Sequence, residues 1–344
     1  MFDSSKQALI DALSTRHGKA HQLWQRAYNA RKEFSGDKIY LRGLVEFSNI
    51  CAKDCYYCGI RKSNTLVQRY KLEREQVLAA AAEADRRKLG SITLQSGEVC
   101  SGEITDFVED IIKTIKKDFP DLRVVLSCGE QSKETYKTWL KAGANRYLLK
   151  IETSNQHLYA KLHPDDNNHS LKHRINCLHT LGELGYQLGS GIMVGLPWQT
   201  SAIIAEDILF FKNINIDMCG IGPFVEHAET PLYNNKEELL SYDERLVLTL
   251  NTIACIRLSM PDVNIAAATS LDALNPKGKE LAVSAGANVI MINLTPGEER
   301  PNYALYQRPQ ESLDKDILSE LQKYGETIAY GQGGDSKHFQ NKQK

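Results

Sequence analysis

The chain has 344 residues, and its 42 Lys and Arg nearly balance its 43 Asp and Glu, giving a net charge of −1. That balance argues against a nucleic-acid or membrane-surface partner, and no run approaches the roughly 20 apolar residues of a membrane span. Because the first residues, MFDSSKQALIDAL, lack the features of a secretory signal, we expect a cytoplasmic protein whose eight cysteines are thiols or metal ligands.

Residues 5–35 carry apolar positions at helical spacing, which predicts a helical N-terminal extension over residues 1–37. From residue 38, short apolar runs alternate with longer amphipathic segments. Eight runs are predicted strands: 39–47, 91–95, 123–127, 146–151, 187–194, 217–221, 263–268 and 288–292. The segments between them are predicted helices: 73–88, 104–117, 133–142, 171–184, 202–212, 239–259 and 279–285.

Glycines mark the ends of several predicted helices, just before the next strand: Gly90, Gly143, Gly185 and Gly286. Apolar strands that alternate with helices indicate a parallel sheet covered by helices. Eight such units predict an α/β protein with a (β/α)8 TIM-type barrel over residues 38–300, and a doubly wound open sheet is the alternative. We expect residues 301–344 to form a C-terminal helix and a polar tail, disordered over residues 331–344.

A barrel places its functional residues directly after the strands, and three cysteines follow the first one. Cys51, Cys55 and Cys58 lie within eight residues, a spacing that can hold one face of an iron–sulfur cluster and leave one iron open. A structural zinc site requires four protein ligands, and no second ligand pair follows at zinc-finger distance. The pattern therefore favours a cluster over a zinc site or three unrelated thiols.

With Tyr57 directly before the last cysteine, this loop resembles the radical S-adenosylmethionine (SAM) superfamily. The resemblance implies that Cys51, Cys55 and Cys58 hold a [4Fe–4S] cluster, whose open iron takes the amino and carboxylate groups of SAM. It also implies that one electron from the cluster cleaves SAM to methionine and a 5′-deoxyadenosyl radical. Tyr57 becomes a candidate cofactor contact.

Polar residues follow the other predicted strands, and some of them resemble SAM contacts of the superfamily. The candidates are Gln95, Ser96, Gly97, Glu98, Lys150, Glu152, Arg174, Met193 and Thr269. Gln95 to Glu98 resemble a Gly-Gly-Glu element that contacts SAM, with Ser96 in place of a glycine. We expect Glu98 and Glu152 to be catalytic. The alternative for Glu152 is a helix N-cap formed by Thr153 or Ser154.

Arg174 and Met193 each have a second interpretation. A guanidinium can hold a carboxylate through two parallel hydrogen bonds, so Arg174 could hold the carboxylate of SAM, but a surface salt bridge is the commoner fate of a helical arginine. Met193 could contact the cofactor or simply fill the core. Glu130, which follows the third predicted strand, is expected to shape the rim of the barrel.

Several segments together resemble the HydE family of [FeFe]-hydrogenase maturases: 47–51, 57–61, 69–70, 94–98, 193–197, 220–224 and 286–291. The resemblance implies that the 5′-deoxyadenosyl radical acts on an iron–cysteine complex carrying CO and cyanide, which the maturase HydG supplies. The product would lead to the di-iron subcluster of the hydrogenase. A HydF scaffold and a reductant such as flavodoxin or ferredoxin are further expected partners.

Two neighbouring families are alternatives. A methylornithine-synthase-like enzyme would rearrange a small amino acid. Biotin synthase needs a second cluster, but its cysteine positions fall here on Leu94, Val125 and Gly189, which disfavours it. The chain also departs from many HydE members, because Lys150 replaces an arginine, Ala268 replaces a threonine, and no cysteine follows Cys255 to hold a second cluster near the C-terminus.

Overall fold

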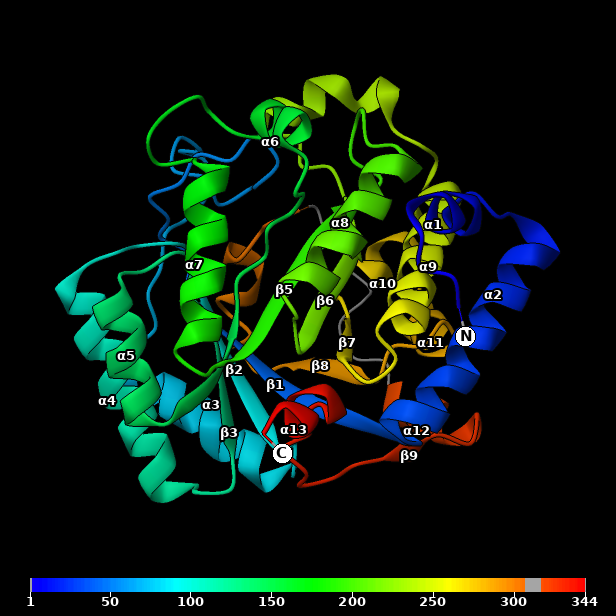
Figure 1. The fold of residues 1–344 in the computed structure, drawn as a ribbon. Helices are drawn as coiled ribbons and strands as arrows, with labels where there is room; N and C mark the ends of the chain where they lie inside the picture. The colour runs from blue at the N-terminus through cyan, green and yellow to red at the C-terminus, as the bar shows by residue number, and fades with distance from the viewer. Residues whose placement is uncertain (1, 307–316, 344) are drawn as a thin grey trace.

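A computed structural model describes residues 2–306 and 317–343. Eight parallel strands close into a barrel in the order β2-β3-β4-β5-β6-β7-β8-β1, and β1 pairs with β2 to complete it (Figure 1). The strands are β1 (Lys38–Ser48), β2 (Ser91–Ser96), β3 (Arg123–Ser127), β4 (Ala144–Leu148), β5 (Gln187–Val194), β6 (Met218–Pro223), β7 (Asn264–Ala267) and β8 (Val289–Asn293). The predicted barrel is confirmed, and the open sheet is wrong.

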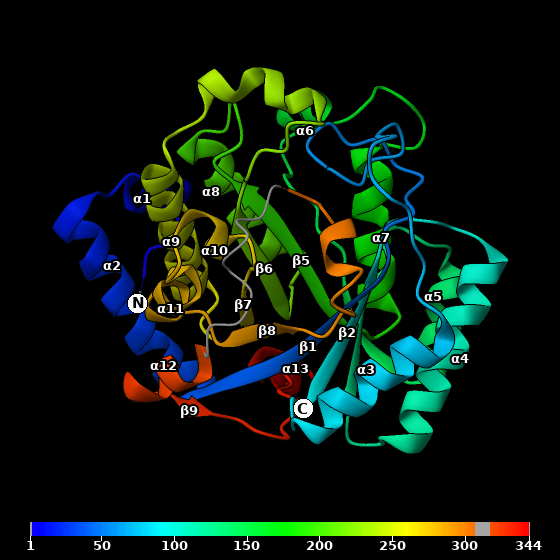
Figure 2. The ribbon, with the colours of Figure 1, turned by 180° about the vertical axis from the view of Figure 1, so that it is seen from behind.

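Helices follow the strands and cover the outside of the barrel (Figures 1 and 2). They are α3 (Arg74–Arg86), α4 (Gly102–Asp118), α5 (Lys133–Ala142), α6 (Gln156–Leu162), α7 (Leu171–Glu183), α8 (Ser201–Asn213), α9 (Tyr242–Ser259), α10 (Leu271–Leu274) and α11 (Gly278–Ser284). Short 3-10 helices occur at Pro231–Glu238 and Arg300–Asn302. None of the helices in the described part of the chain is long and apolar enough to cross a membrane.

All seven predicted helices are present, and the glycines expected at helix ends adopt positive φ, as at Gly143 with φ 119°. The predicted fourth strand was placed too late, because β4 spans Ala144–Leu148 and the chain then leaves the regular ladder. Helices α6 and α10 were not predicted, since each is too short to show a helical period. Helix α9 begins at Tyr242, where Ser241 and Glu244 form a capping box.

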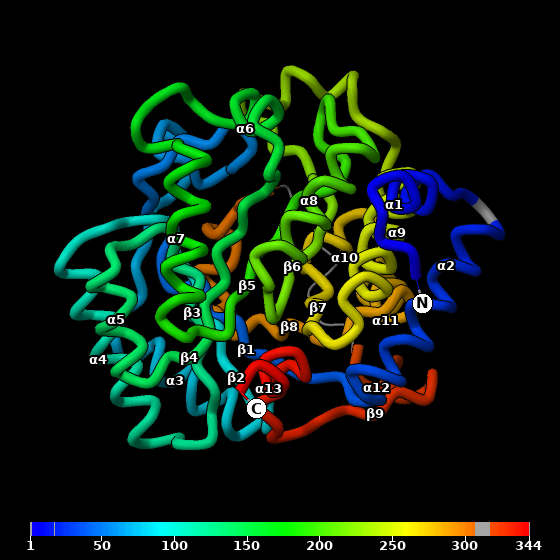
Figure 3. Tube along the Cα trace, viewed as in Figure 1, coloured from blue at the N-terminus to red at the C-terminus, as the bar shows by residue number. Residues whose placement is uncertain are grey.

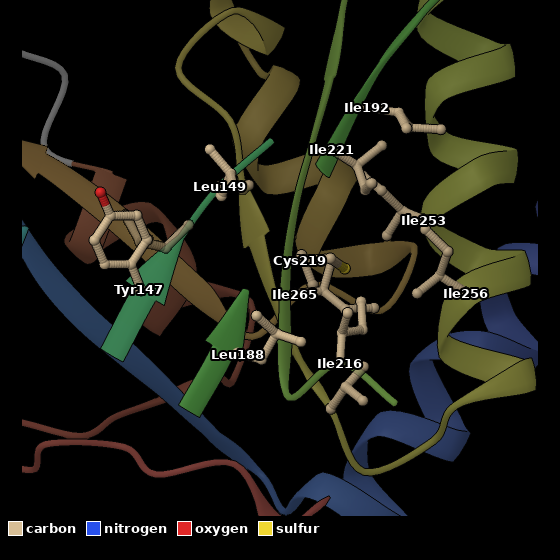
Figure 4. Close-up of a cluster of buried hydrophobic side chains, with 14 of the residues drawn as sticks. Tyr147, Leu149, Leu188, Ile192, Ile216, Cys219, Ile221, Ile253, Ile256 and Ile265 are labelled. Atoms are coloured by element: carbon tan, nitrogen blue, oxygen red, sulfur yellow. The ribbon is translucent and has the colours of Figure 1, made fainter. Parts of the chain in front are cut away.

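The main core lies between the barrel wall and the surrounding helices. Figure 4 shows apolar side chains of β5, β6 and β7, among them Leu188, Ile221 and Ile265, facing Ile253 and Ile256 of α9. The labelled aliphatic side chains are nearly or fully buried, so removal of this apolar surface from water is the main stabilising contribution of the wall. This rigid wall fixes the ends of the strands, where the candidate residues lie.

The N-terminal segment packs on one side of the barrel (Figures 1 and 3). It comprises α1 (Lys6–Leu13), α2 (His17–Ala30) and a single π-helical turn at Arg31–Ser35. Helix α1 packs against α8, and α2 packs against α9. The indole of Trp24 donates a hydrogen bond to the side-chain oxygen of Asn251 at 2.8 Å, which connects the N-terminal segment to α9.

The C-terminal segment lies below the strands in Figures 1 and 2 and covers their amino-terminal ends. It contains α12 (Ile317–Lys323), the short strand β9 (Thr327–Ile328), which pairs with the start of β1, and α13 (Lys337–Lys342). The predicted disorder of residues 331–344 is wrong for residues 331–343, and Lys344 lies outside the described residues. The guanidinium of Arg146 is fully buried and requires a partner, which Asp335 supplies at 2.7 Å.

A buried ion pair joins the two terminal segments, and its loss is expected to destabilise the fold. Arg31 contacts Glu326 at 2.7 Å, and their side chains are 0% and 3% exposed. Arg31→Met should lower the free energy of unfolding by about 3–5 kcal/mol, because a carboxylate is left buried without its partner. Denaturant unfolding measures the effect. Arg86→Met, which breaks the exposed pair with Glu83, is the control, and equal effects of the two variants would contradict this prediction.

Candidate active site

The three cysteines lie on the loop after β1, which borders the upper outer edge of the barrel beside α6 and α7 (Figures 1 and 2). This loop is hydrogen-bonded to the loop after β2. The Ala52 N–H donates to the Glu98 carbonyl at 2.8 Å, and the Gly97 N–H donates to the Ser48 carbonyl at 2.8 Å. The Glu98 N–H points at the Cys51 sulfur at 3.3 Å. The two loops therefore form one unit at the carboxyl ends of their strands.

Arg69 supports the cysteine loop from within, a role that its position in the sequence did not reveal. Its guanidinium donates hydrogen bonds of 2.6 to 3.1 Å to four backbone carbonyls, those of Asn49, Ile60, Arg61 and Asn64. These carbonyls lie on both sides of Cys51, Cys55 and Cys58 in the sequence. A single side chain thus cross-links the two ends of the loop and fixes the backbone that carries the thiols.

Cys51, Cys55 and Cys58 are free thiols and only partly exposed. Burial raises the pKa of Cys55 to about 12, and burial together with the charges of Cys55 and Cys51 raises the pKa of Cys58 well above its ordinary value. Thiolates at this position therefore need a nearby positive charge, which an iron–sulfur cluster can provide. In the described part of the chain, no three His, Cys, Asp or Glu side chains form a group that could hold a single metal ion.

Next to the thiols lies a cage of four charged side chains, Lys53, Glu98, Glu130 and Arg174. Lys53 contacts Glu98 at 2.9 Å and Glu130 at 2.8 Å, and Arg174 contacts the same two carboxylates at 2.9 and 2.8 Å. All four side chains are between 6% and 12% exposed. Two cations and two anions therefore neutralise each other beside the cysteine loop.

The contacts within the cage favour the charged forms of Glu130 and Lys53. Burial alone would raise the pKa of Glu130, but Arg174 and Lys53 outweigh burial and hold that pKa below its ordinary value. Likewise, burial would lower the pKa of Lys53, and the two carboxylates raise it instead. Arg174 also donates to the Lys150 carbonyl at 2.9 Å. Because its side chain is only 11% exposed, its ion pairs are largely buried and are not the surface salt bridge considered from the sequence.

Lys150 and Glu152 directly follow β4. Their charged atoms are 3.0 Å apart, and Glu152 is 9% exposed. Glu152 is one of few non-glycine residues with positive φ, at 62°, and its backbone N–H donates to the Gly191 carbonyl at 3.0 Å. The N-cap of α6 is Asn155 rather than Thr153 or Ser154, so the helix-cap interpretation of Glu152 is wrong.

Tyr57 and Met193 each pack against a small apolar cluster formed by Leu158, Leu162, Leu196, Phe224 and Leu232. Burial lowers the pKa of His163 to about 3, so this imidazole is neutral. Its Nδ1 donates to the Tyr159 carbonyl at 2.9 Å, which leaves Nε2 to accept the Tyr57 hydroxyl at 3.3 Å. His163 thereby orients the tyrosine that precedes the last cysteine.

The remaining candidates have other partners. Gln95 donates to the hydroxyl of Tyr303 at 3.3 Å, and the hydroxyls of Thr269 and Tyr306 lie 3.0 Å apart. The Ser96 hydroxyl donates to the neighbouring Gly97 carbonyl. The structure thus brings the cysteines, Glu98 and Arg174 together, and it places Gln95 and Thr269 beside tyrosines that follow β8.

The segment after α6 was not expected to take part in the site. His169 accepts the Asp54 backbone N–H at 2.8 Å through Nε2 and contacts Asp166 at 2.6 Å through Nδ1. The Lys53 ammonium also donates to the Asn168 carbonyl. The segment therefore holds the cysteine loop through contacts between residues more than 100 positions apart.

Gly97 is predicted to be essential for the cysteine loop. A Cβ at this position would lie 2.2 Å from the Ile50 carbonyl oxygen and 2.9 Å from the Cβ of Cys51, so Gly97→Ala must displace the loop. We expect Gly97→Ala to lower the iron content after reconstitution. Gly102→Ala is a matched control, because no atom lies within 4 Å of its new Cβ. Full iron content in the Gly97 variant would contradict the prediction.

Comparisons with known proteins agree with this geometry. The Radical SAM superfamily matches residues 45–211. The [FeFe] hydrogenase maturase subunit HydE of Thermotoga maritima is 42% identical over 88% of this chain and 84% of its own length. The 3-methylornithine synthase of Methanosarcina acetivorans is 27% identical over 94% of this chain and 88% of its own.

A solved structure of methylornithine synthase superposes with a TM-score of 0.81, at 24% identity and 95% coverage of both chains, and this likeness supports the barrel fold. The match to the superfamily begins within β1 and includes the cysteine loop, while the match to the maturase covers most of both chains. On this evidence the chain belongs to the radical SAM superfamily and, within it, to the HydE family of [FeFe]-hydrogenase maturases.

Proposed function

We propose that Cys51, Cys55 and Cys58 hold a [4Fe–4S] cluster and that the chain cleaves SAM during maturation of [FeFe]-hydrogenase. The observation that carries this proposal is the cysteine loop itself, placed beside a charged cage at the carboxyl ends of the strands, in a chain 42% identical to a HydE subunit. When bound, the cluster supplies the single electron that cleaves SAM to methionine and the 5′-deoxyadenosyl radical.

The residues present fit such a cluster. Three thiols on one loop leave a fourth iron without a protein ligand, and the Glu98 N–H at 3.3 Å from the Cys51 sulfur is a hydrogen-bond donor of the kind that tunes cluster potentials. The absence of a side chain at Gly97 gives the Cys51 side chain room. Arg69 keeps the loop in place through four carbonyls.

The charged cage suits a ligand that carries both an ammonium and a carboxylate, as SAM does. We assign Glu98 to the ammonium of SAM, and Arg174 with Lys53 to its carboxylate. Glu152 after β4 is proposed to accept hydrogen bonds from the ribose or the amino group, and Lys150 stands 3.0 Å from it. The remaining cofactor contacts are proposed to be Tyr57, Gln95, Ser96, Gly97, Met193 and Thr269.

The proposed substrate is an iron–cysteine complex carrying CO and cyanide, supplied by HydG, and the proposed product leads to the di-iron subcluster. HydF as a scaffold and flavodoxin or ferredoxin as reductant are the proposed partners, in the cytoplasm. The similarity to HydE over 88% of the chain supports this substrate. The barrel would exclude water from the reaction and protect the radical.

Turnover of the HydG product tests the proposed substrate. The reconstituted chain with SAM and a reductant is mixed with the HydG product, and 5′-deoxyadenosine formation is compared with the rate without that product. We expect a clear increase. Unchanged SAM cleavage and an unconsumed iron–cysteine complex would overturn the substrate assignment, and the SAM chemistry would still stand.

Rearrangement of a small amino acid is the second candidate function. The similarity to 3-methylornithine synthase extends over 94% of this chain, which is why this candidate remains open. The two functions differ in the substrate that accelerates SAM cleavage. A reaction with free amino acids, in the absence of any iron complex, would favour the synthase-like function over the maturase.

A further inference from the structure

Glu152 holds a backbone conformation that needs external support. Its φ of 62° lies in the left-handed region, which is unfavourable for residues other than glycine and persists only where the surroundings enforce it. On one side the Glu152 N–H is bonded to the Gly191 carbonyl at 3.0 Å. On the other side, the support must come from contacts of the next two residues, Thr153 and Ser154.

Those residues are held by Asp207 on α8, whose side chain is fully buried. Its Oδ1 accepts the Ser154 backbone N–H at 2.5 Å, the Ser154 hydroxyl at 2.6 Å and the Thr153 hydroxyl at 3.3 Å. In the described part of the chain no Lys or Arg forms an ion pair with Asp207. Three hydrogen bonds thus converge on one oxygen atom, within two residues of Glu152.

The helix that carries Asp207 makes a second contact with the same turn. Glu206 accepts a hydrogen bond from the Asn155 side chain at 3.0 Å and contacts Lys6 of α1 at 2.7 Å. This outer contact is partly exposed, so it is worth little by itself. The buried oxygen of Asp207 is the contact that fixes residues 153 and 154.

We propose that Asp207 is a positioning residue, which enforces the left-handed conformation of Glu152 by binding the two residues after it and so directs the Glu152 carboxylate to the ligand. The proposal deepens the proposed function and rests on it, because Glu152 is assigned there to SAM. Both contacts to Ser154 go to Oδ1, while the Thr153 hydroxyl lies within reach of both carboxylate oxygens, at 3.3 and 3.4 Å. We therefore expect the position of the acceptor oxygen to matter more than the negative charge.

Two variants separate the contribution of the acceptor oxygen from that of the negative charge. Asp207→Ala removes the acceptor, and Asp207→Asn retains one oxygen in the same place. We expect Asp207→Ala to weaken SAM binding, measured by calorimetry on the reconstituted protein, by about ten- to a hundred-fold, the scale of a small misplacement of a contact group. Asp207→Asn should restore most of the affinity.

Asp217→Ala is the matched control, because Asp217 is equally buried and accepts the Leu188 N–H at 2.8 Å, at the opposite end of the barrel. It should lower stability and leave SAM affinity unchanged. Equal losses of affinity in the Asp207→Ala and Asp217→Ala variants, or no loss in either, would overturn the proposal.

Unfolding measurements test the support of the strained conformation without SAM. Because glycine adopts positive φ readily, Glu152→Gly removes the need for support, and Asp207→Ala should then lower the unfolding midpoint by less than it does in the parent protein. Strictly additive shifts would contradict the proposal. If Glu152→Gln leaves SAM affinity unchanged, the assignment of Glu152 to SAM is wrong, and the unfolding cycle still decides the role of Asp207.

Discussion

Cys55→Ala is expected to lose the cluster and, with it, SAM binding. Iron content after anaerobic reconstitution should fall from about four atoms per chain towards zero. Two remaining thiols cannot replace the third, since Cys51 and Cys58 lie on a loop whose backbone is fixed by Arg69 and by the Glu98 carbonyl. Iron analysis and calorimetric titration with SAM measure both effects.

Cys100→Ala is the matched control for this experiment. Cys100 lies in the loop after β2 and is exposed, so it is close to the site in the sequence but is not among the proposed ligands. The control should retain iron and SAM binding. If Cys55→Ala keeps a full complement of iron, or if Cys100→Ala loses it, the assignment of the cluster ligands is wrong.

Arg174→Gln is expected to produce the second large effect, a loss of SAM affinity of at least about a hundred-fold. In the described part of the chain the variant leaves Lys53 as the one Lys or Arg that pairs with Glu98 and Glu130, with the His173 imidazole 3.7 Å from Glu130. Breaking a buried ion pair in this way costs about 3–5 kcal/mol. Arg174→Lys should recover only part of the loss, because an ammonium cannot reproduce the planar fork that reaches both carboxylates and the Lys150 carbonyl.

Arg31→Met distinguishes this effect from a general loss of stability. It also breaks a buried pair, between the terminal segments of the chain, but its ion pair with Glu326 includes none of the cage residues. It should lower the unfolding midpoint and leave SAM affinity intact. Equal SAM affinities in the Arg174→Gln and Arg31→Met variants would contradict the assigned role of the cage.

The sequence predicted the barrel because local signals are strong there. The strands are short and largely apolar, and a glycine such as Gly143 ends the preceding helix with positive φ. The cysteine loop was equally visible, because its three thiols lie within eight residues. Glu98 and Arg174 were identified as site residues, although their mutual contact depends on the closed barrel.

The missed features depend on contacts between distant segments. Lys53 lies within the cysteine loop, but its partners Glu98 and Glu130 are far along the chain, and nothing local indicates that they meet. The C-terminal tail is polar and was expected to be disordered. It is ordered because Asp335 neutralises Arg146, which sits buried at the amino-terminal end of the barrel, and composition alone does not show such a partner.

Reductive cleavage of SAM by the reconstituted chain tests the central claim most directly. The protein is loaded with iron and sulfide under anaerobic conditions, supplied with SAM and a strong reductant, and assayed for 5′-deoxyadenosine and methionine. We predict that both products form in equal amounts and that neither forms with Cys55→Ala. A protein with a complete [4Fe–4S] cluster that leaves SAM intact would contradict the account.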